Sequence, residues 1–148
     1  MNSKVLIIAG AAAVALAGAA SFYVSRTIDP VEKSIQSATA PDGRYKAVAF
    51  RLSQDGAAPF CYDMASIFLA IYPDSFAESE KAYQVYWSPC ATPADPAEAP
   101  KVEWLSKDLV RITYTPGPPA KDPRRLRKRV VDASRAVKVA YVERVPPY

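Results

Sequence analysis

The feature that most constrains this chain is a long apolar run near its start. The run extends from Val5 to Val24, reads VLIIAGAAAVALAGAASFYV, and lies between Lys4 and Arg26 without any charge. A helix rises about 1.5 Å per residue, so about 20 apolar residues can cross a hydrocarbon core of about 30 Å. The run therefore predicts a membrane segment, and the rest of the chain is what that segment exports or holds.

Two kinds of membrane segment fit the run. In a cleaved secretory signal, Lys4 and the free amino terminus supply the positive start, and residues 17–19, AGA, supply the cleavage site near Ala19. In a retained anchor, residues 22–24, FYV, carry the apolar run past that site and place two aromatic rings at interfacial depth. The length and the flanking aromatics favour the anchor. Ala19 stands where a lipoprotein signal needs its cysteine, so lipid attachment there is excluded.

Either kind of segment exports the chain that follows it. We therefore expect a protein of the bacterial inner membrane with its domain in the periplasm or outside the cell, or a protein secreted after cleavage near Ala19. Beyond residue 25 the chain is long enough for one small domain with its own core. The expected division is a membrane anchor or signal over residues 1–25, a polar tether over 26–40 in which 31–36 form at most one short helix, and a folded domain over 41–148.

Strand patterns dominate the predicted domain, and Pro interrupts them often. It opens at Pro41-Asp42-Gly43, a turn signature in which Gly is free to take positive φ. Residues 74–81 read as a loop or a single helical turn, and residues 106–108 as the turn of a hairpin. The fold class is mainly β, one small antiparallel domain built as a sandwich or an open sheet. The expected strands are residues 44–52, 64–72, 82–88, 102–105, 109–115 and 136–142.

Two segments carry a resemblance to a known group of proteins. Residues 41–48, PDGRYKAV, and the later pair VEWL at 102–105 and LVRITY at 109–114 are similar to elements of small, uncharacterised, membrane-anchored bacterial envelope proteins. Those proteins open their domain with a Ser-Pro-Asp-Gly turn, and Ala40 stands here in place of the Ser. The resemblance implies a membrane-tethered β domain with a PDG turn and implies no catalytic activity.

The two cysteines, Cys61 and Cys90, read as a disulfide in an exported domain and as two buried thiols in a cytosolic one. The export prediction favours the disulfide. Such a bridge would close a loop of about 30 residues and stabilise the fold by about 3 to 4 kcal/mol through loop entropy.

The residues that usually carry catalysis are mostly missing. The chain has no His, which excludes Ser-His-Asp and Cys-His arrangements and imidazole metal ligands. It also has no Gly-rich phosphate loop, and no cofactor or metal site is predicted. Asp74, Glu78 and Glu80 are interpreted as solvated surface with Lys81 as their local partner. Paired carboxylates for a carbohydrate-active hydrolase remain open, with the candidates Asp55, Asp63, Glu103 and Asp108.

The net charge of +4 resides in one segment. Residues 121–129, KDPRRLRKR, carry six basic residues and one acid, so the rest of the chain is nearly neutral. This segment, which we expect to be helical or irregular, is a candidate contact for anionic lipid headgroups or an acidic partner protein; a solvated loop is the equal alternative. Nucleic acid is disfavoured because no aromatic residues are interleaved. The candidate contact residues are Arg124, Arg125, Arg127, Lys128 and Arg129.

These features predict an exported β domain attached to the membrane through the run from Val5 to Val24. The most consistent function is a non-enzymatic interaction or assembly module of the cell envelope. The alternative is an envelope hydrolase or carbohydrate-active domain that uses acidic residues. A small protein that neutralises a toxin would also suit the length, although no residue points to it.

Overall fold

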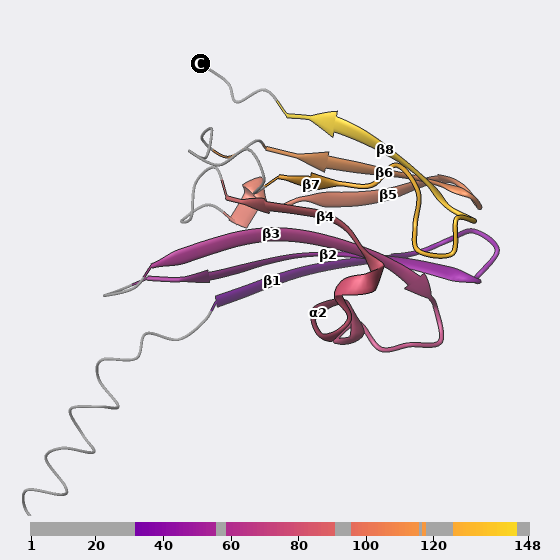
Figure 1. Cartoon of the computed structure of the whole chain (residues 1–148), viewed down its shortest axis with the longest axis horizontal. Helices are drawn as coiled ribbons and strands as arrows, with labels where there is room; N and C mark the ends of the chain where they lie inside the picture. The colour runs from indigo at the N-terminus through magenta and orange to yellow at the C-terminus, as the bar shows by residue number, and fades with distance from the viewer. Residues whose placement is uncertain (1–31, 56–58, 91–95, 116, 118–125, 145–148) are drawn as a thin grey trace, which may run out of the picture.

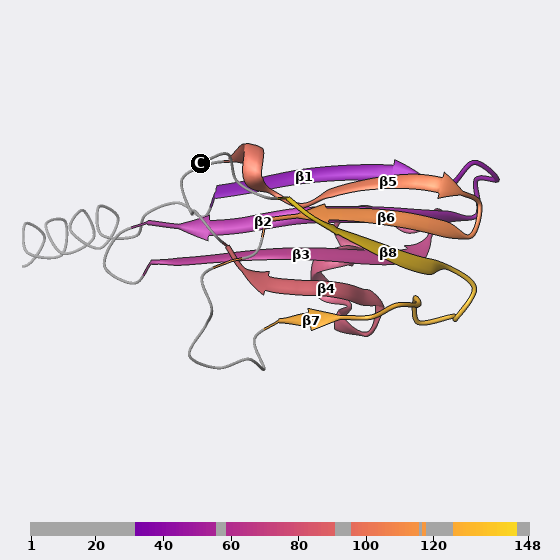
Figure 2. The same ribbon diagram turned by 90° about the horizontal axis from the view of Figure 1, so that it is seen from above.

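Two β-sheets face each other in the computed structural model, which describes residues 32–55, 59–90, 96–115, 117 and 126–144 (Figures 1 and 2). Sheet A has the strand order β1-β2-β3-β4-β7, and sheet B has the order β5-β6-β8. The strands of sheet A are β1 (Glu32–Thr39), β2 (Tyr45–Gln54), β3 (Phe60–Leu69), β4 (Gln84–Pro89) and β7 (Arg127–Lys128). Those of sheet B are β5 (Lys101–Ser106), β6 (Leu109–Tyr114) and β8 (Lys138–Glu143). The prediction of a mainly β domain is confirmed.

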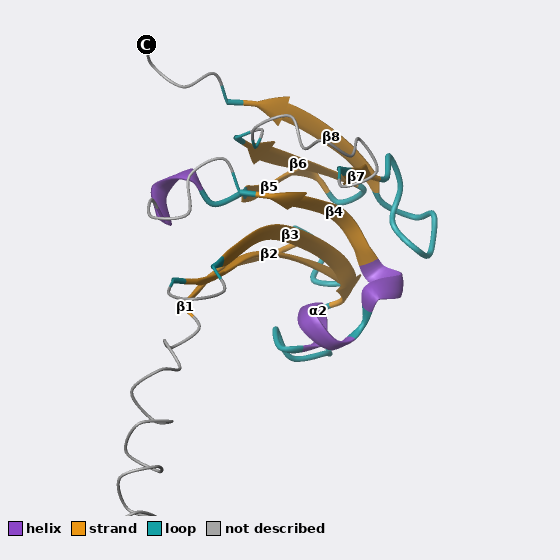
Figure 3. Ribbon diagram, turned by 60° about the vertical axis from the view of Figure 1, so that its left-hand side comes forward, coloured by secondary structure: helices purple, strands orange, loops and turns teal. Residues whose placement is uncertain are grey.

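The helical elements are single turns. They are α2 (Phe76–Ser79) and the 3-10 helices η1 (Lys81–Tyr83) and η2 (Pro96–Glu98). Figure 3 shows α2 below sheet A, on the side opposite sheet B. None of the helices in the described ranges has the length and apolar character needed to cross a bilayer. The run from Val5 to Val24 lies outside the described residues.

The alternation of small and large apolar side chains along β2 lets this strand contribute to two cores. Ala47 and Ala49 contribute to the core between the sheets, whereas Val48 and Phe50 contribute to a second core that lies under α2. The small side chains on the inner face of β2 let sheet B approach closely. The large side chains on its outer face fill the space between sheet A and α2. β2 is therefore buried on both faces. The largest fully buried side chains of the two cores are Tyr86, Phe50, Phe68, Ile67 and Ile112.

The domain begins earlier than the sequence predicted. Residues 32–39 form β1, which pairs with β2 from Glu32 opposite Ser53 to Thr39 opposite Lys46. The prediction of a polar tether over 26–40 is therefore wrong for these eight residues, and so is the short helix over 31–36. The PDG turn connects β1 to β2, with Gly43 at φ 73° and its N–H donating to the Ala40 carbonyl at 2.9 Å. β1 is polar because it is an edge strand with largely solvated side chains.

One strand pair departs from the antiparallel prediction. β8 runs parallel to β6, from Leu109 opposite Lys138 to Tyr114 opposite Glu143. Between these two strands the chain crosses to sheet A, where Arg127 and Lys128 form β7 and pair with β4. A strand that returns from the other sheet can enter in the same direction as its neighbour, so no hairpin is needed.

Several boundaries differ from the predicted ones. β3 begins at Phe60 and ends at Leu69, so residues 70–72 form a turn instead of completing a strand. The basic segment contains β7 where we expected a helix or irregular chain. The single helical turn within 74–81 and the hairpin between β5 and β6 are confirmed.

Side chains from one sheet close the edge of the other. The Gln36 Oε1 of β1 accepts from the backbone N–H of Val102 in β5 at 3.1 Å. The indole N–H of Trp104 donates to the Ala38 carbonyl at 2.8 Å. Unpaired edge groups of both strands are thereby satisfied across the sandwich, which fixes β1 against β5.

The sandwich has two distinct ends along its strands. The proximal end, at which the chain enters β1, contains Ser53, Phe60 and Cys90. The distal end contains the turn at 40–43 and the turn after β3 (Figure 1).

Candidate functional site

Three aromatic rings form a continuous stack on the outer face of sheet A at its proximal end. The Phe60 and Tyr62 ring centroids are 5.8 Å apart, and those of Tyr62 and Trp87 are 5.2 Å apart, with both pairs stacked. Tyr62 lies opposite Leu52, and Trp87 lies opposite Met64, so apolar side chains flank the stack. The rings are half-buried. We call Phe60, Tyr62 and Trp87 the aromatic surface.

The aromatic surface occupies the part of this face that α2 does not cover. Toward the distal end, Phe68 of β3 packs against Phe76 of α2, and Phe76 packs against Tyr83 of η1. Figures 1 and 3 show α2 on this face of sheet A, toward the distal end of its strands. Phe, Tyr and Trp rings that stack on a sheet face offer apolar area together with the polar tips of Tyr and Trp.

The predicted basic segment is divided by the strand it forms. Arg127 lies opposite Trp87 and Lys128 opposite Tyr86. Since opposed residues of an antiparallel pair share a face, Arg127 lies on the outer face beside the aromatic surface, and Lys128 lies on the inner face. The sequence suggested that these residues form one patch, but Arg127 and Lys128 lie on opposite faces of sheet A.

Two of the predicted contact residues are engaged within the domain. The Lys128 ammonium lies 4.1 Å from the Tyr114 ring centroid and 5.5 Å from that of Tyr141, and it donates to the Tyr114 hydroxyl. The Arg129 guanidinium donates to the Ala82 carbonyl at 2.8 Å. Both therefore help to hold β7 to its neighbours. Arg124 and Arg125 lie outside the described residues.

A second exposed surface is present at the distal end. The turn that follows β3 carries Ile71 at 82% exposure, with Leu69 at 40% and Tyr72 at 36%. We call these three residues the apolar tip. Because Ile71 is four-fifths exposed in a turn that also carries Leu69 and Tyr72, the apolar tip is a candidate contact site.

The four candidate hydrolase carboxylates have separate partners. Asp63 is buried against Arg51, Glu103 pairs with Arg111 on sheet B, and Asp108 accepts from the Ser106 hydroxyl in the β5–β6 turn. That hydroxyl holds the pKa of the Asp108 carboxyl below its usual range. Asp55 is exposed at the end of β2. Among the described contacts, no two of these carboxylates meet.

The acidic residues around α2 hold the helix to sheet A. Asp74 accepts from the Lys46 ammonium at 2.7 Å, and Glu78 pairs with Lys33 of β1. Glu80 is exposed. The interpretation as surface residues fits, but the cations that pair with Asp74 and Glu78 come from β1 and β2, whereas the sequence analysis assigned Lys81.

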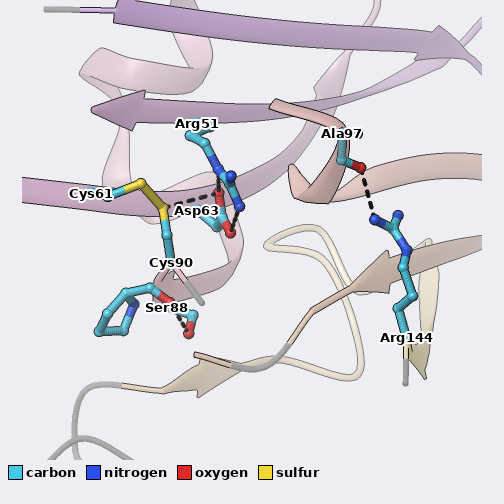
Figure 4. A network of polar contacts seen from close by, with 8 residues as sticks. Arg51, Cys61, Asp63, Ser88, Cys90, Ala97 and Arg144 are labelled. Atoms are coloured by element: carbon cyan, nitrogen blue, oxygen red, sulfur yellow. Dashed lines mark hydrogen bonds and ion pairs between the residues drawn. A yellow bond between two sulfur atoms is a disulfide. The ribbon is translucent and has the colours of Figure 1, made fainter. Parts of the chain in front are cut away.

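Cys61 and Cys90 form a disulfide that joins the end of β4 to β3, with 5.4 Å between their Cα atoms. Beside it lies a buried ion pair (Figure 4). The Arg51 Nε is 2.8 Å from Asp63 Oδ1, and Nη2 is 2.9 Å from Oδ2. The Cys90 sulfur lies 3.6 Å from Asp63 Oδ1. The disulfide predicted from the sequence is confirmed, and the ion pair is additional.

Burial raises the pKa of the Asp63 carboxyl, and the Arg51 guanidinium opposes that rise through its hydrogen bond and its charge. Glu98 raises the pKa further. The pair is well formed, with Asp63 1% exposed, so the two groups form a structural link between β2 and β3 and not a reactive acid.

A small cavity of about 140 Å³ lies between the edges of the two sheets. The described residues that line it carry no carboxylate and no thiol, so they supply neither a nucleophile nor an acid–base pair. The residues that line it are Ser34, Gln36, Ala49, Ala99, Pro100 and Lys101.

Sequence reasoning missed both exposed surfaces. Phe60 and Tyr62 precede the predicted strand 64–72, and their stack with Trp87 depends on the register between β3 and β4. Tyr72 and Ile71 were placed inside that strand, so the turn was not foreseen. Comparison with known proteins adds no relative, because neither a family model, nor a curated protein, nor a solved structure matches the chain.

Proposed function

We propose that this chain is a membrane-tethered, exported β domain that serves as a non-enzymatic interaction or assembly module of the cell envelope. The observation that carries the proposal is the apolar tip, which lies at the opposite end of the sandwich from the point where the chain enters. A domain held at one end and apolar at the other is suited to holding a partner away from the bilayer.

The composition of the tip supports a protein partner. Leu69, Ile71 and Tyr72 combine two aliphatic side chains with an aromatic ring, and Tyr72 stacks on Phe76 with 4.4 Å between the centroids. This stacking orders the ring before any partner binds, which lowers the entropy cost of association. Aromatic residues are enriched in protein interfaces.

The disulfide and the apolar run support export together. Disulfides persist in oxidising compartments, and the run from Val5 to Val24 is long enough to span a bilayer. Intact mass of the protein recovered from bacterial membranes tests both features. We expect the mass of the full chain less two hydrogens. A mass that lacks about 19 residues would instead indicate a secreted, untethered domain.

The apolar tip can be tested by photo-crosslinking in cells that produce the full chain. We expect a photoreactive residue at position 71 to give a discrete protein adduct, and Leu69→Ser to weaken it. Leu105 on sheet B is the matched control because it is 47% exposed, and we expect no adduct at that position. Equal labelling at 71 and 105, or none at 71, would remove the tip as the partner site.

The hydrolase alternative has no support from the described residues. Its four candidate carboxylates are dispersed over separate strands and turns, and the described cavity holds none of them. We therefore do not carry it forward.

A further inference from the structure

The distance between the predicted anchor and the folded domain is short. β1 begins at Glu32, and the apolar run is closed by Arg26. Six residue steps span at most about 20 Å even when fully extended. If the run is retained in the membrane, the start of β1 at the proximal end of the sandwich stays within about 20 Å of the bilayer.

The aromatic surface lies at this same end. Glu32 pairs with Ser53, and Phe60 pairs with Gln54, the next residue of β2. Phe60 and Tyr62 both lie on β3, two strands away from β1, where the chain enters, and Trp87 lies on the next strand, β4. The apolar tip, by contrast, lies at the far end of β3.

We propose, on the basis of the membrane tether in the proposed function, that the aromatic surface docks on the lipid bilayer at the level of the headgroups. Phe60 supplies apolar area, and Tyr62 and Trp87 supply rings with one apolar body and one polar tip. Tyr and Trp are the residues enriched at membrane interfaces, because such rings satisfy both the acyl boundary and the wet headgroups.

Charge adds a smaller contribution. Arg127 lies opposite Trp87 on the outer face. A basic side chain close to a bilayer is attracted to anionic headgroups. Asp55, which is exposed at the end of β2, opposes this attraction. The rings therefore carry the docking, and anionic lipid strengthens it modestly.

The tether explains why a small surface suffices. A domain that is already attached does not lose its translational freedom when it docks, because its local concentration at the lipid is high. Half-buried rings, too weak to recruit a free protein to a bilayer, are then enough to orient a tethered one. Docking of the proximal end would hold the apolar tip away from the bilayer.

Photo-crosslinking of the purified full chain in lipid vesicles tests the docking. Benzoylphenylalanine replaces Tyr62 in one protein and Tyr72 of the apolar tip in a matched control. The vesicles are phosphatidylcholine, with and without phosphatidylglycerol. We expect lipid adducts by mass spectrometry at position 62, several-fold above position 72, and a modest increase with phosphatidylglycerol that Arg127→Ala removes.

Three outcomes would overturn the proposal. Equal lipid labelling at positions 62 and 72 would show no preferred orientation. A product of twice the chain mass at position 62 would assign the aromatic surface to a second copy of this chain. No labelling of any kind at position 62 would leave the aromatic surface in water.

The tether is scored separately from the docking. Flotation of the unmodified chain with the vesicles reports insertion of the apolar run, whatever the aromatic surface does. Flotation without lipid adducts at position 62 refutes the docking alone, and failure to float refutes the tether. Intact mass of each variant, two hydrogens light, verifies that the Cys61–Cys90 disulfide and hence the fold have formed.

Discussion

The Arg51 guanidinium holds both carboxylate oxygens of Asp63 across the β2–β3 pair, at 2.8 and 2.9 Å, in a site where both side chains are at most 3% exposed. Two charges can be buried in this way only if they remain together, because each alone has lost its hydration. The pair therefore makes β2 and β3 mutually dependent at the proximal end.

Breaking this pair should destabilise the domain strongly. We expect Asp63→Ala to lower the free energy of unfolding by about 3 to 5 kcal/mol, because it removes the carboxylate that compensates the buried Arg51 charge. The double variant Arg51→Met with Asp63→Leu should recover most of that loss. Urea unfolding of the single variants Arg51→Met and Asp63→Leu and of the double variant measures the coupling. Losses that simply add would contradict a coupled pair.

Reducing the disulfide should weaken the same end of the fold. Cys61 and Cys90 are separated by 29 positions, so their bond removes about 3 to 4 kcal/mol of loop entropy from the unfolded chain. We expect the variant Cys61→Ser with Cys90→Ser to unfold at a correspondingly lower urea concentration. Reductant should destabilise the natural chain and leave the double variant unchanged. An unchanged midpoint in the double variant would show that strand pairing alone closes this loop.

Alkaline pH should destabilise the fold through Tyr141. Burial raises the pKa of Tyr141 from 10.0 to about 12, partly offset by its hydrogen bond with the Arg129 backbone. The folded state thus keeps this proton at pH values where the unfolded chain loses it. Stability from the neutral ring is fully present below pH 10 and is lost as the pH rises toward 12.

Tyr141→Phe provides the test. The hydroxyl lies 2.7 Å from the Val85 carbonyl, so its removal should cost about 1 kcal/mol at neutral pH. The variant should also lose less stability than the natural chain between pH 10 and 12. Tyr72→Phe removes a hydroxyl from the exposed tip as a control. Parallel profiles for the natural chain and Tyr141→Phe, from urea midpoints across this range, would refute the assignment.

The neighbours Arg127 and Lys128 should respond differently to substitution. Lys128→Ala removes an ammonium that lies 4.1 Å from the Tyr114 ring centroid, and we expect a loss of about 1 kcal/mol in unfolding free energy. Arg127→Ala should change stability by less than about 0.5 kcal/mol, because its side chain lies on the exposed outer face. Thermal unfolding of both variants decides the matter, and equal losses would contradict the two-faced placement.

The strands that the sequence predicted well have one property in common. β2, β5 and β6 alternate buried and exposed side chains or carry a dense apolar pattern, and their boundaries fall within two residues of the expected ones. The disulfide was also predictable, because two cysteines in a chain that is expected to be exported leave few alternatives.

The elements that the sequence did not predict depend on partners far along the chain. β1 reads EKSIQSAT, a polar segment that becomes a strand because β2 and the Trp104 side chain satisfy its backbone. The parallel entry of β8 into sheet B depends on the path through β7, which no local pattern records. The aromatic surface required the register that sets Tyr62 beside Trp87.

The pairing of β1 also has a mechanical consequence. A pull on the chain that precedes Glu32 would act along the length of β1, while a partner on the apolar tip would resist from the opposite end of β3. The load would then act in shear on all eight β1–β2 residue pairs together, from Glu32–Ser53 to Thr39–Lys46. Strands loaded in this direction must break their hydrogen bonds at the same time and not one by one. β1, which the sequence predicted to be part of a polar tether, is therefore the part of the domain best placed to bear tension.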